Sequence, residues 1–260
     1  MSSNPYAAPK ATVADAASAP QGNFLPGGRG VAAARGWDWI VEGWNLFKKQ
    51  PGMWIGLIVV ALILFFVMAI IPFIGSLAMM VLGPVFTGGV MLGCRALDEG
   101  NELELGHLFA GFREKFGTLA AVGAIYLVAM LVIALVVGLV MGVGMFALFS
   151  GGEPGAGAAA GAVMGTLLGI LIMLALMLPV VMAIWLAPAL VVLNGRGAVE
   201  AMKESFSGCL KNIVPFLLYG VVLFVASIVA AIPLFLGWLV LGPVFAGSIY
   251  ASYRDIYFTS

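Results

Sequence analysis

Six stretches of at least 18 residues contain no Asp, Glu, Lys, Arg or His, and this pattern limits the possible folds more than any other. A helix needs about 20 mostly apolar residues to cross the ~30 Å hydrocarbon core of a bilayer. Of the 260 residues, 63% are hydrophobic and only 9% are charged, which is far below the usual charge content of a soluble domain. We therefore expect an all-α integral membrane protein with six transmembrane helices, at Trp54–Ile71, Ile74–Cys94, Thr118–Phe149, Val163–Val192, Ile213–Ile232 and Leu236–Tyr253.

The six apolar stretches fall into three similar units, at about residues 36–97, 105–193 and 197–258. Each unit has a short amphipathic segment followed by two apolar stretches, and the second stretch contains a proline. Internal similarity of this kind is typical of membrane proteins built from repeats, so we expect three helical hairpins, each preceded by an interfacial amphipathic helix. The sequences around the prolines are Leu82-Gly83-Pro84-Val85-Phe86, Leu186-Ala187-Pro188-Ala189-Leu190 and Leu241-Gly242-Pro243-Val244-Phe245.

Residues 1–30 differ from the rest of the chain, because they are rich in Ala, Ser, Pro and Gly and contain no apolar run long enough for a signal peptide. Such a segment buries too little apolar surface to fold alone. We expect residues 1–30 to form a disordered cytoplasmic tail and residues 31–260 to form the six-span membrane domain.

The basic residues indicate the orientation in the membrane. Outside the tail, every Lys and Arg lies before the first span, after the last span, or in the second and fourth connections. The other three connections contain Glu153 as their only charge. Cytoplasmic loops carry an excess of Lys and Arg, so we expect both termini in the cytoplasm.

Three short segments have the period of amphipathic helices. Before the first span, apolar residues recur at steps of three and four from Trp37 to Phe47, and related segments precede the third and fifth spans. We expect these helices to lie in the cytoplasmic interface, where they either bind anionic headgroups or only seat the hairpins at the right depth. The candidate lipid contacts are Trp37, Trp44, Phe47, Lys48, Lys49, Phe109, Phe112, Arg113, Lys203 and Phe206.

The sequence contains no recognisable set of catalytic, cofactor-binding or metal-binding residues. The spans lack ionisable carboxylates and bases, which argues against proton coupling and against a charged selectivity ring. One histidine, His107, and two distant cysteines, Cys94 and Cys209, are too few for a Cys/His zinc site. Neither a Gly-x-Ser-x-Gly motif nor a phosphate-binding loop occurs, and a net charge of zero gives no argument for nucleic acid. We expect a non-enzymatic protein.

The prolines within the spans are the remaining candidates for a site. Each of Pro84, Pro188 and Pro243 removes a helical N–H donor and frees a carbonyl group. Freed carbonyls at membrane depth are tolerated where they are buried in protein or line a cavity. The three prolines are therefore candidate cavity-lining kinks, and the alternative is that they only let the helices bend and pack.

Three phrases of the sequence resemble a proteobacterial family of uncharacterised multi-pass inner-membrane proteins, over most of Gly36–Tyr257. That family has no assigned activity, so the resemblance implies the membrane fold and a location in the bacterial inner membrane, and it implies no functional residues. The stretch Ala198–Ser205 is similar to the membrane domain attached to some glycerophosphodiester phosphodiesterases, whose catalytic domain has no counterpart in the sequence. The phrases are Gly36-Trp37-Asp38-Trp39-Ile40-Val41-Glu42-Gly43-Trp44, Gly83-Pro84-Val85-Phe86 through Met91-Leu92-Gly93-Cys94-Arg95-Ala96-Leu97, and Leu103-Glu104-Leu105-Gly106-His107-Leu108-Phe109-Ala110-Gly111-Phe112.

Three functions fit these features. The first is a membrane protein that binds or moves lipid or another amphiphile. The second is a scaffold or regulatory subunit of a membrane complex, and the third is a channel or small-solute permease, against which the lack of polar residues in the spans counts. The expected partners are membrane lipids and either further copies of the chain or another membrane protein, and no cofactor is expected.

Overall fold

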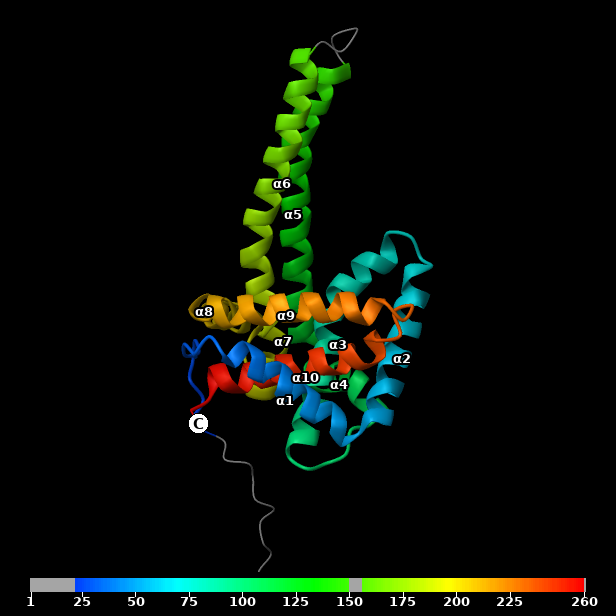
Figure 1. The fold of residues 1–260 in the computed structure, drawn as a ribbon, viewed down its shortest axis with the longest axis vertical. Coiled ribbons are helices and arrows are strands. Elements are labelled where there is room, and N and C mark those ends of the chain that lie inside the picture. Colours follow the sequence, from blue (N-terminus) through cyan, green and yellow to red (C-terminus); the bar gives the residue numbers. More distant parts are fainter. Residues whose placement is uncertain (1–21, 150–155, 260) are drawn as a thin grey trace, which may run out of the picture.

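The computed structural model describes residues 22–149 and 156–259, and the described part of the chain is almost entirely helical. Figure 1 shows the arrangement of the helices. In chain order they are α1 (Arg35–Lys49), α2 (Pro51–Ala69), α3 (Ile74–Asp98), η1 (Leu105–Phe109), α4 (Ala110–Glu114), α5 (Phe116–Phe149), α6 (Ala156–Trp185), α7 (Ala187–Asn194), α8 (Ala198–Lys211), α9 (Ile213–Ala231) and α10 (Trp238–Tyr257).

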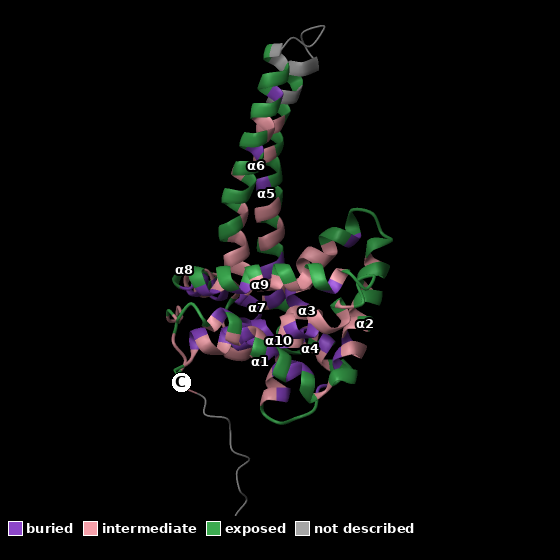
Figure 2. Ribbon diagram, viewed as in Figure 1, coloured by how far each residue is buried: buried purple, intermediate pink, exposed green. Residues whose placement is uncertain are grey.

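The helices α5 and α6 form a long antiparallel arm that extends beyond the other helices, which gather around one end of it as a base (Figure 1). Because α5 continues unbroken for 34 residues at ~1.5 Å per residue, it is about 50 Å long. Side chains of the arm are mostly exposed, and Leu135, Leu139 and Leu171 are each more than 60% exposed (Figure 2). An apolar surface of this size requires lipid around the arm.

Within the described residues, five helices are long and apolar enough to cross a membrane, which indicates a membrane protein. They lie at Pro51–Ala69, Ile74–Asp98, Phe116–Gly142, Ala159–Asn194 and Ile213–Ala231. The sixth predicted span, Leu236–Tyr253, forms most of α10 but does not belong to this set. The last turn of α10 contains Arg254 and Asp255, and eleven of the 20 residues of this helix are buried among other helices.

The first and last helices of the chain pack side by side in the base (Figure 1). Their backbones approach so closely that a Cβ atom at Gly43 on α1 would lie 2.4 Å from the Val244 carbonyl oxygen on α10. Trp39 on α1 is completely buried beside this contact and packs on Phe216 and Tyr219 of α9. The core of the base therefore joins segments from opposite ends of the sequence.

A related contact occurs where α4 meets α3. A Cβ atom at Gly111 would lie 2.1 Å from the carbonyl oxygen of Val85, the residue that follows Pro84. In the contact between α1 and α10, Val244 likewise follows Pro243. In both places a glycine of a short helix lies on the carbonyl group next to a proline in a long helix, and only glycine has room for this approach.

The junction between α6 and α7 is built around a serine. In an unbroken helix the N–H of Leu186 would donate to the carbonyl of Met182. Here the Leu186 N–H donates to the Ser205 hydroxyl at 3.0 Å, and that hydroxyl donates to the Met182 carbonyl at 2.7 Å. Ser205, on α8, is completely buried. Its side chain is thus inserted into the hydrogen-bond ladder, which breaks the helix just before Pro188.

Residues 22–34 form an extended strap across α8 and α10, so residues 22–30 are not part of a disordered tail. The main-chain carbonyls of Gly27 and Gly28 accept hydrogen bonds from Lys211, at 3.0 and 2.8 Å. The side chain of Asn212 bonds both the carbonyl of Arg29 and the N–H of Val31, each at 2.8 Å. Both glycines have positive φ angles, of 75° and 69°, that other residues rarely adopt. Residues 1–21, the rest of the predicted tail, lie outside the described residues.

Candidate functional site

A shallow groove lies where α8 meets the lower part of the arm. Its volume is about 380 Å³, and its lining is almost entirely apolar. The α8 residues in the lining are spaced by three and four positions, so they share one face of that helix. The groove is lined by Ile125 on α5, Ala183 on α6, and Val199, Met202, Lys203 and Phe206 on α8.

Lys203 is the only charged residue in the lining of this groove. It is exposed, and in the part of the chain that the structure describes it takes part in no ion pair. The two carboxylates nearest to it along α8 both face Arg196, with Glu200 at 2.7 Å and Glu204 at 3.4 Å. Lys203 therefore makes no direct ion pair with its neighbours on α8.

The groove is continuous with the apolar surface of the arm. Ile125 is 38% exposed, and Val128 and Val132 on the following turns of α5 are 60% and 53% exposed. On the other side of the groove, Val199 is 55% exposed. A chain lying in the groove would thus pass directly into the region that the exposed leucines of the arm assign to lipid.

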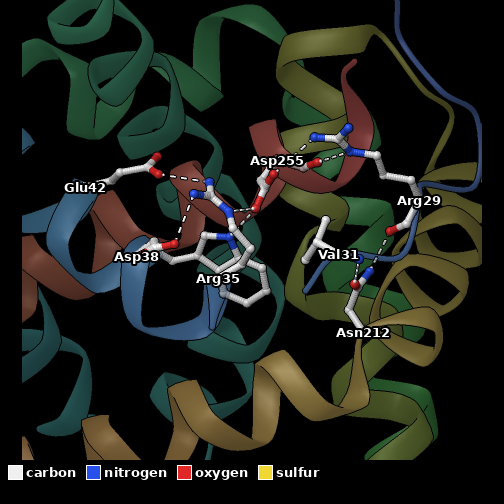
Figure 3. Close-up of polar contacts among 8 residues, drawn as sticks. Arg29, Val31, Arg35, Asp38, Glu42, Asn212 and Asp255 are labelled. Atoms are coloured by element: carbon white, nitrogen blue, oxygen red, sulfur yellow. Dashed lines mark hydrogen bonds and ion pairs between the residues drawn. The ribbon is translucent and has the colours of Figure 1, made fainter. Parts of the chain in front are cut away.

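The carboxylate of Asp255 on α10 connects the strap and α1 (Figure 3). It accepts hydrogen bonds from Arg29 at 3.2 Å, from Arg35 at 2.5 Å and from the indole of Trp39 at 2.9 Å. The guanidinium of Arg35 also pairs with Glu42 at 3.0 Å. Partial burial raises the pKa of Glu42, and this effect exceeds the opposing influence of Arg35.

The C-terminal half of α10 contacts three further helices through polar side chains. Arg254 pairs with Asp98 at the end of α3, and the Tyr253 hydroxyl donates to the side chain of Asn194 at the end of α7. The Tyr257 hydroxyl donates to the main-chain carbonyl of Glu204 on α8 at 2.7 Å. These contacts hold the base together. No cluster of metal-binding side chains occurs among the described residues.

The predicted lipid contacts have different surroundings in the structure. Lys203 and Phe206 line the groove. Trp37 and Trp44 are 54% and 43% exposed on one side of α1, as a contact with lipid requires. Phe47 is only 7% exposed, so its assignment as a lipid contact is wrong: α1 also has an apolar side that packs in the base.

The remaining predicted contacts also divide between surface and interior. Phe109 is 38% exposed, whereas Phe112 is half-buried and stacks on Phe116. The Lys49 ammonium donates to the main-chain carbonyl of Leu97 at 2.6 Å. Lys49 is nevertheless exposed, as are Lys48 and Arg113.

The three prolines proposed as cavity-lining kinks are all buried, and none of them lines the groove. Pro84 and Pro243 lie inside α3 and α10, whereas Pro188 lies in the first turn of α7. The groove residues missing from the sequence analysis include Ile125 and Ala183. They carry no local signal, because each lies in a long apolar stretch with many similar neighbours.

Neither cysteine is placed for chemistry. Cys94 and Cys209 are both buried and unpaired with each other. Burial raises the pKa of the Cys209 thiol to about 12, so this thiol stays protonated and unreactive at neutral pH.

Residues 51–253 match a protein family described as a domain of unknown function, DUF7847. The chain belongs to this family. The DUF7847 region begins at the start of α2 and includes all the groove residues, whereas the strap and α1 precede it. Comparisons with curated proteins and with solved structures gave no match. Membership of DUF7847 agrees with the resemblance to an uncharacterised family, and it brings no activity with it.

Proposed function

We propose that this DUF7847 protein is a non-enzymatic membrane protein that binds lipid or another amphiphile in the groove between α8 and the arm. The observation that carries the proposal is the position of Lys203 among apolar side chains from three helices. A cationic group at the edge of an apolar groove matches an amphiphile, which has a polar head and an apolar tail.

The pairing of Phe24 with Phe258 is compatible with a six-span arrangement, as with any even number of spans. Phe24 and Phe258 form a β-bridge, and the Leu25 N–H donates to the carbonyl of Tyr257 at 2.8 Å. Both ends therefore lie on the same side of any membrane that the protein crosses, and the number of crossings is even. Five crossings would be an odd number. If all five apolar helices cross the membrane, α10 must therefore cross it as well.

A crossing by α10 is compatible with its sequence. Backbone and side-chain polar groups at membrane depth are tolerated when protein surrounds them. The helix lies against α1, α2, α3 and α9, and its Asp255 and Arg254 are both paired. Together with the one-sided distribution of Lys and Arg, this favours both termini in the cytoplasm and a location in the bacterial inner membrane.

Native mass spectrometry of the protein, released gently from its own membrane, tests the proposed function. We expect an amphiphile retained at fixed stoichiometry. The variant Ala183→Phe fills the groove and should lose it, whereas Ala175→Phe, an exposed position on the same helix, should retain it. A protein that arrives bare, or only with another polypeptide, would contradict the proposal and favour a scaffold.

A further inference from the structure

The volume of the groove limits what it can hold. A methylene group takes up roughly the ~30 Å³ that a water molecule occupies in the liquid. A groove of about 380 Å³ therefore has room for about a dozen methylene groups, which is most of one acyl chain. A lipid with two chains would leave its second chain outside the groove.

The charges beside the groove select the headgroup. Lys203 offers a compact positive charge to a phosphate or carboxylate. A zwitterionic headgroup would also need an acceptor for its ammonium group, but Glu200 and Glu204 both face Arg196. The groove thus has an attractive partner for an anionic group, and neither carboxylate of α8 belongs to its lining.

The open side of the groove indicates where the second chain would go. Val128 and Val132 continue the lining of the groove along the lipid-facing surface of α5. A lipid can therefore enter sideways from the bilayer, with one chain in the groove and the other still among its neighbours. No large apolar area has to pass through water in this process.

Resting on the function proposed above, we infer that the ligand is an anionic lipid held by a single acyl chain, with its anionic group at Lys203. Diacyl phosphatidylglycerol, its lyso form and a fatty acid share this chemistry. Of these, the sideways entry route favours the diacyl phospholipid, because it is the form present in the bilayer beside α5.

The test is a lipid titration of the purified protein by native mass spectrometry. Phosphatidylglycerol should bind about fivefold more tightly than phosphatidylethanolamine with the same chains, the effect of one lysine near an anionic headgroup. Lys203→Gln should abolish this preference, Lys203→Arg should preserve it, and Lys115→Gln, an exposed lysine outside the groove, should leave it unchanged.

The chain number is tested with lysophosphatidylglycerol and a fatty acid of the same length. Because the groove accepts one chain, the lyso and diacyl lipids should bind within about threefold of each other. A preference above tenfold for the diacyl lipid would contradict the single-chain site, and a preference for the fatty acid would make the carboxylate the recognised group.

The outcomes separate the two proposals. Equal binding of phosphatidylglycerol and phosphatidylethanolamine, with loss of both in Ala183→Phe, would overturn the anionic selectivity and leave the groove as an amphiphile site. The absence of any retained lipid, in the wild type as in Ala183→Phe, would overturn both.

Discussion

The Ser205 hydroxyl accepts a hydrogen bond from the main-chain N–H of Leu186, and it donates a second hydrogen bond to the carbonyl of Met182. A side chain of α8 has thus replaced one main-chain bond at the end of the arm. The next residue of α8, Phe206, lines the groove, as does Ala183 beside Met182. The same contact therefore breaks the helix and sets the spacing of the groove walls.

Removing this hydroxyl should destabilise the protein. In Ser205→Ala, a buried N–H and a buried carbonyl lose their partner, which costs roughly 1–3 kcal/mol. The midpoint of thermal unfolding in detergent, followed by circular dichroism, should fall accordingly. Ser227→Ala is the matched control, because that hydroxyl is exposed and bonds only its own helix, at Phe224. Equal midpoints for the two variants would show that the Ser205 bridge contributes nothing.

Because α1 and α10 are in close contact, we expect replacement of glycine by alanine to lower the stability at Gly43 and to raise it at Gly220. Gly43→Ala would place a methyl group 2.4 Å from the Val244 carbonyl oxygen, so the helices must separate and the unfolding midpoint should drop. Gly220→Ala, on α9, meets nothing within 4 Å and should stabilise by about 0.5–1 kcal/mol through the better helix propensity of alanine. A stabilising effect at both positions would show that α1 and α10 are further apart than described.

Asp255 should be the most sensitive charged position of the base. Asp255→Asn leaves Arg29 and Arg35 without their shared carboxylate, whose side chain is only 9% exposed. We expect a loss of roughly 2 kcal/mol, less than for a fully buried pair because both arginines are about a third exposed. Hydrogen exchange should also become faster in the strap. The control is Asp38→Asn, which removes a 45% exposed partner of Arg35 and should leave both stability and exchange unchanged.

The ionisation of Glu204 should make the stability of the protein depend on pH. Burial raises the pKa of this carboxyl group above its ordinary value of 4.5, and the nearby Arg196 only partly opposes the effect. The fold therefore favours the protonated form, and this stability is lost as the pH rises through the raised pKa. At pH 7, Glu204→Gln should be at least as stable as the wild type, and its stability should vary less between pH 4.5 and 7. Glu200→Gln removes the other partner of Arg196 and is the comparison; a clear loss of stability in Glu204→Gln alone would contradict this reasoning.

The six-span arrangement predicts the side from which single cysteines react. Ile70→Cys and Leu234→Cys place thiols at exposed tips of the α2–α3 and α9–α10 pairs. A maleimide that does not cross membranes should label both from the periplasm in intact cells, while Asn101→Cys, in the loop after α3, should react only after the cells are opened. Both native cysteines are buried and give little background. Labelling of the Leu234 position only after opening would show that α9 and α10 do not cross.

The hydropathy of the sequence predicts the apolar helices but not their neighbours. The sequence located the helices α2, α3, α5, α6 and α9, because a run of about 20 apolar residues without charge rarely forms anything other than a membrane-spanning helix. The same criterion marked Leu236–Tyr253, but it could not show that α10 is the buried centre of the base. Burial of α10 depends on α1, which is about 200 residues away in the sequence.

The strap and the groove escaped prediction for different reasons. The strap is held through main-chain carbonyls of Gly27, Gly28 and Arg29, and such contacts leave no pattern of side chains in the sequence. The groove has walls on three helices, and only its α8 face has a local period. On α1 the period predicted an amphipathic helix, and a helix is present, but the period could not distinguish Trp37, which faces outward, from Phe47, which packs inward.

The pairing of α1 with α10 also determines when the protein can be completed during synthesis. The ribosome makes α1 before α10. The hydrogen bond from Trp39 to Asp255 therefore cannot form until almost the whole chain has been inserted. A contact between such distant segments is slow to form. Until then, the apolar side of α1 is open to whatever assists newly made membrane proteins, and a chain truncated before α10 would keep that side permanently unpartnered.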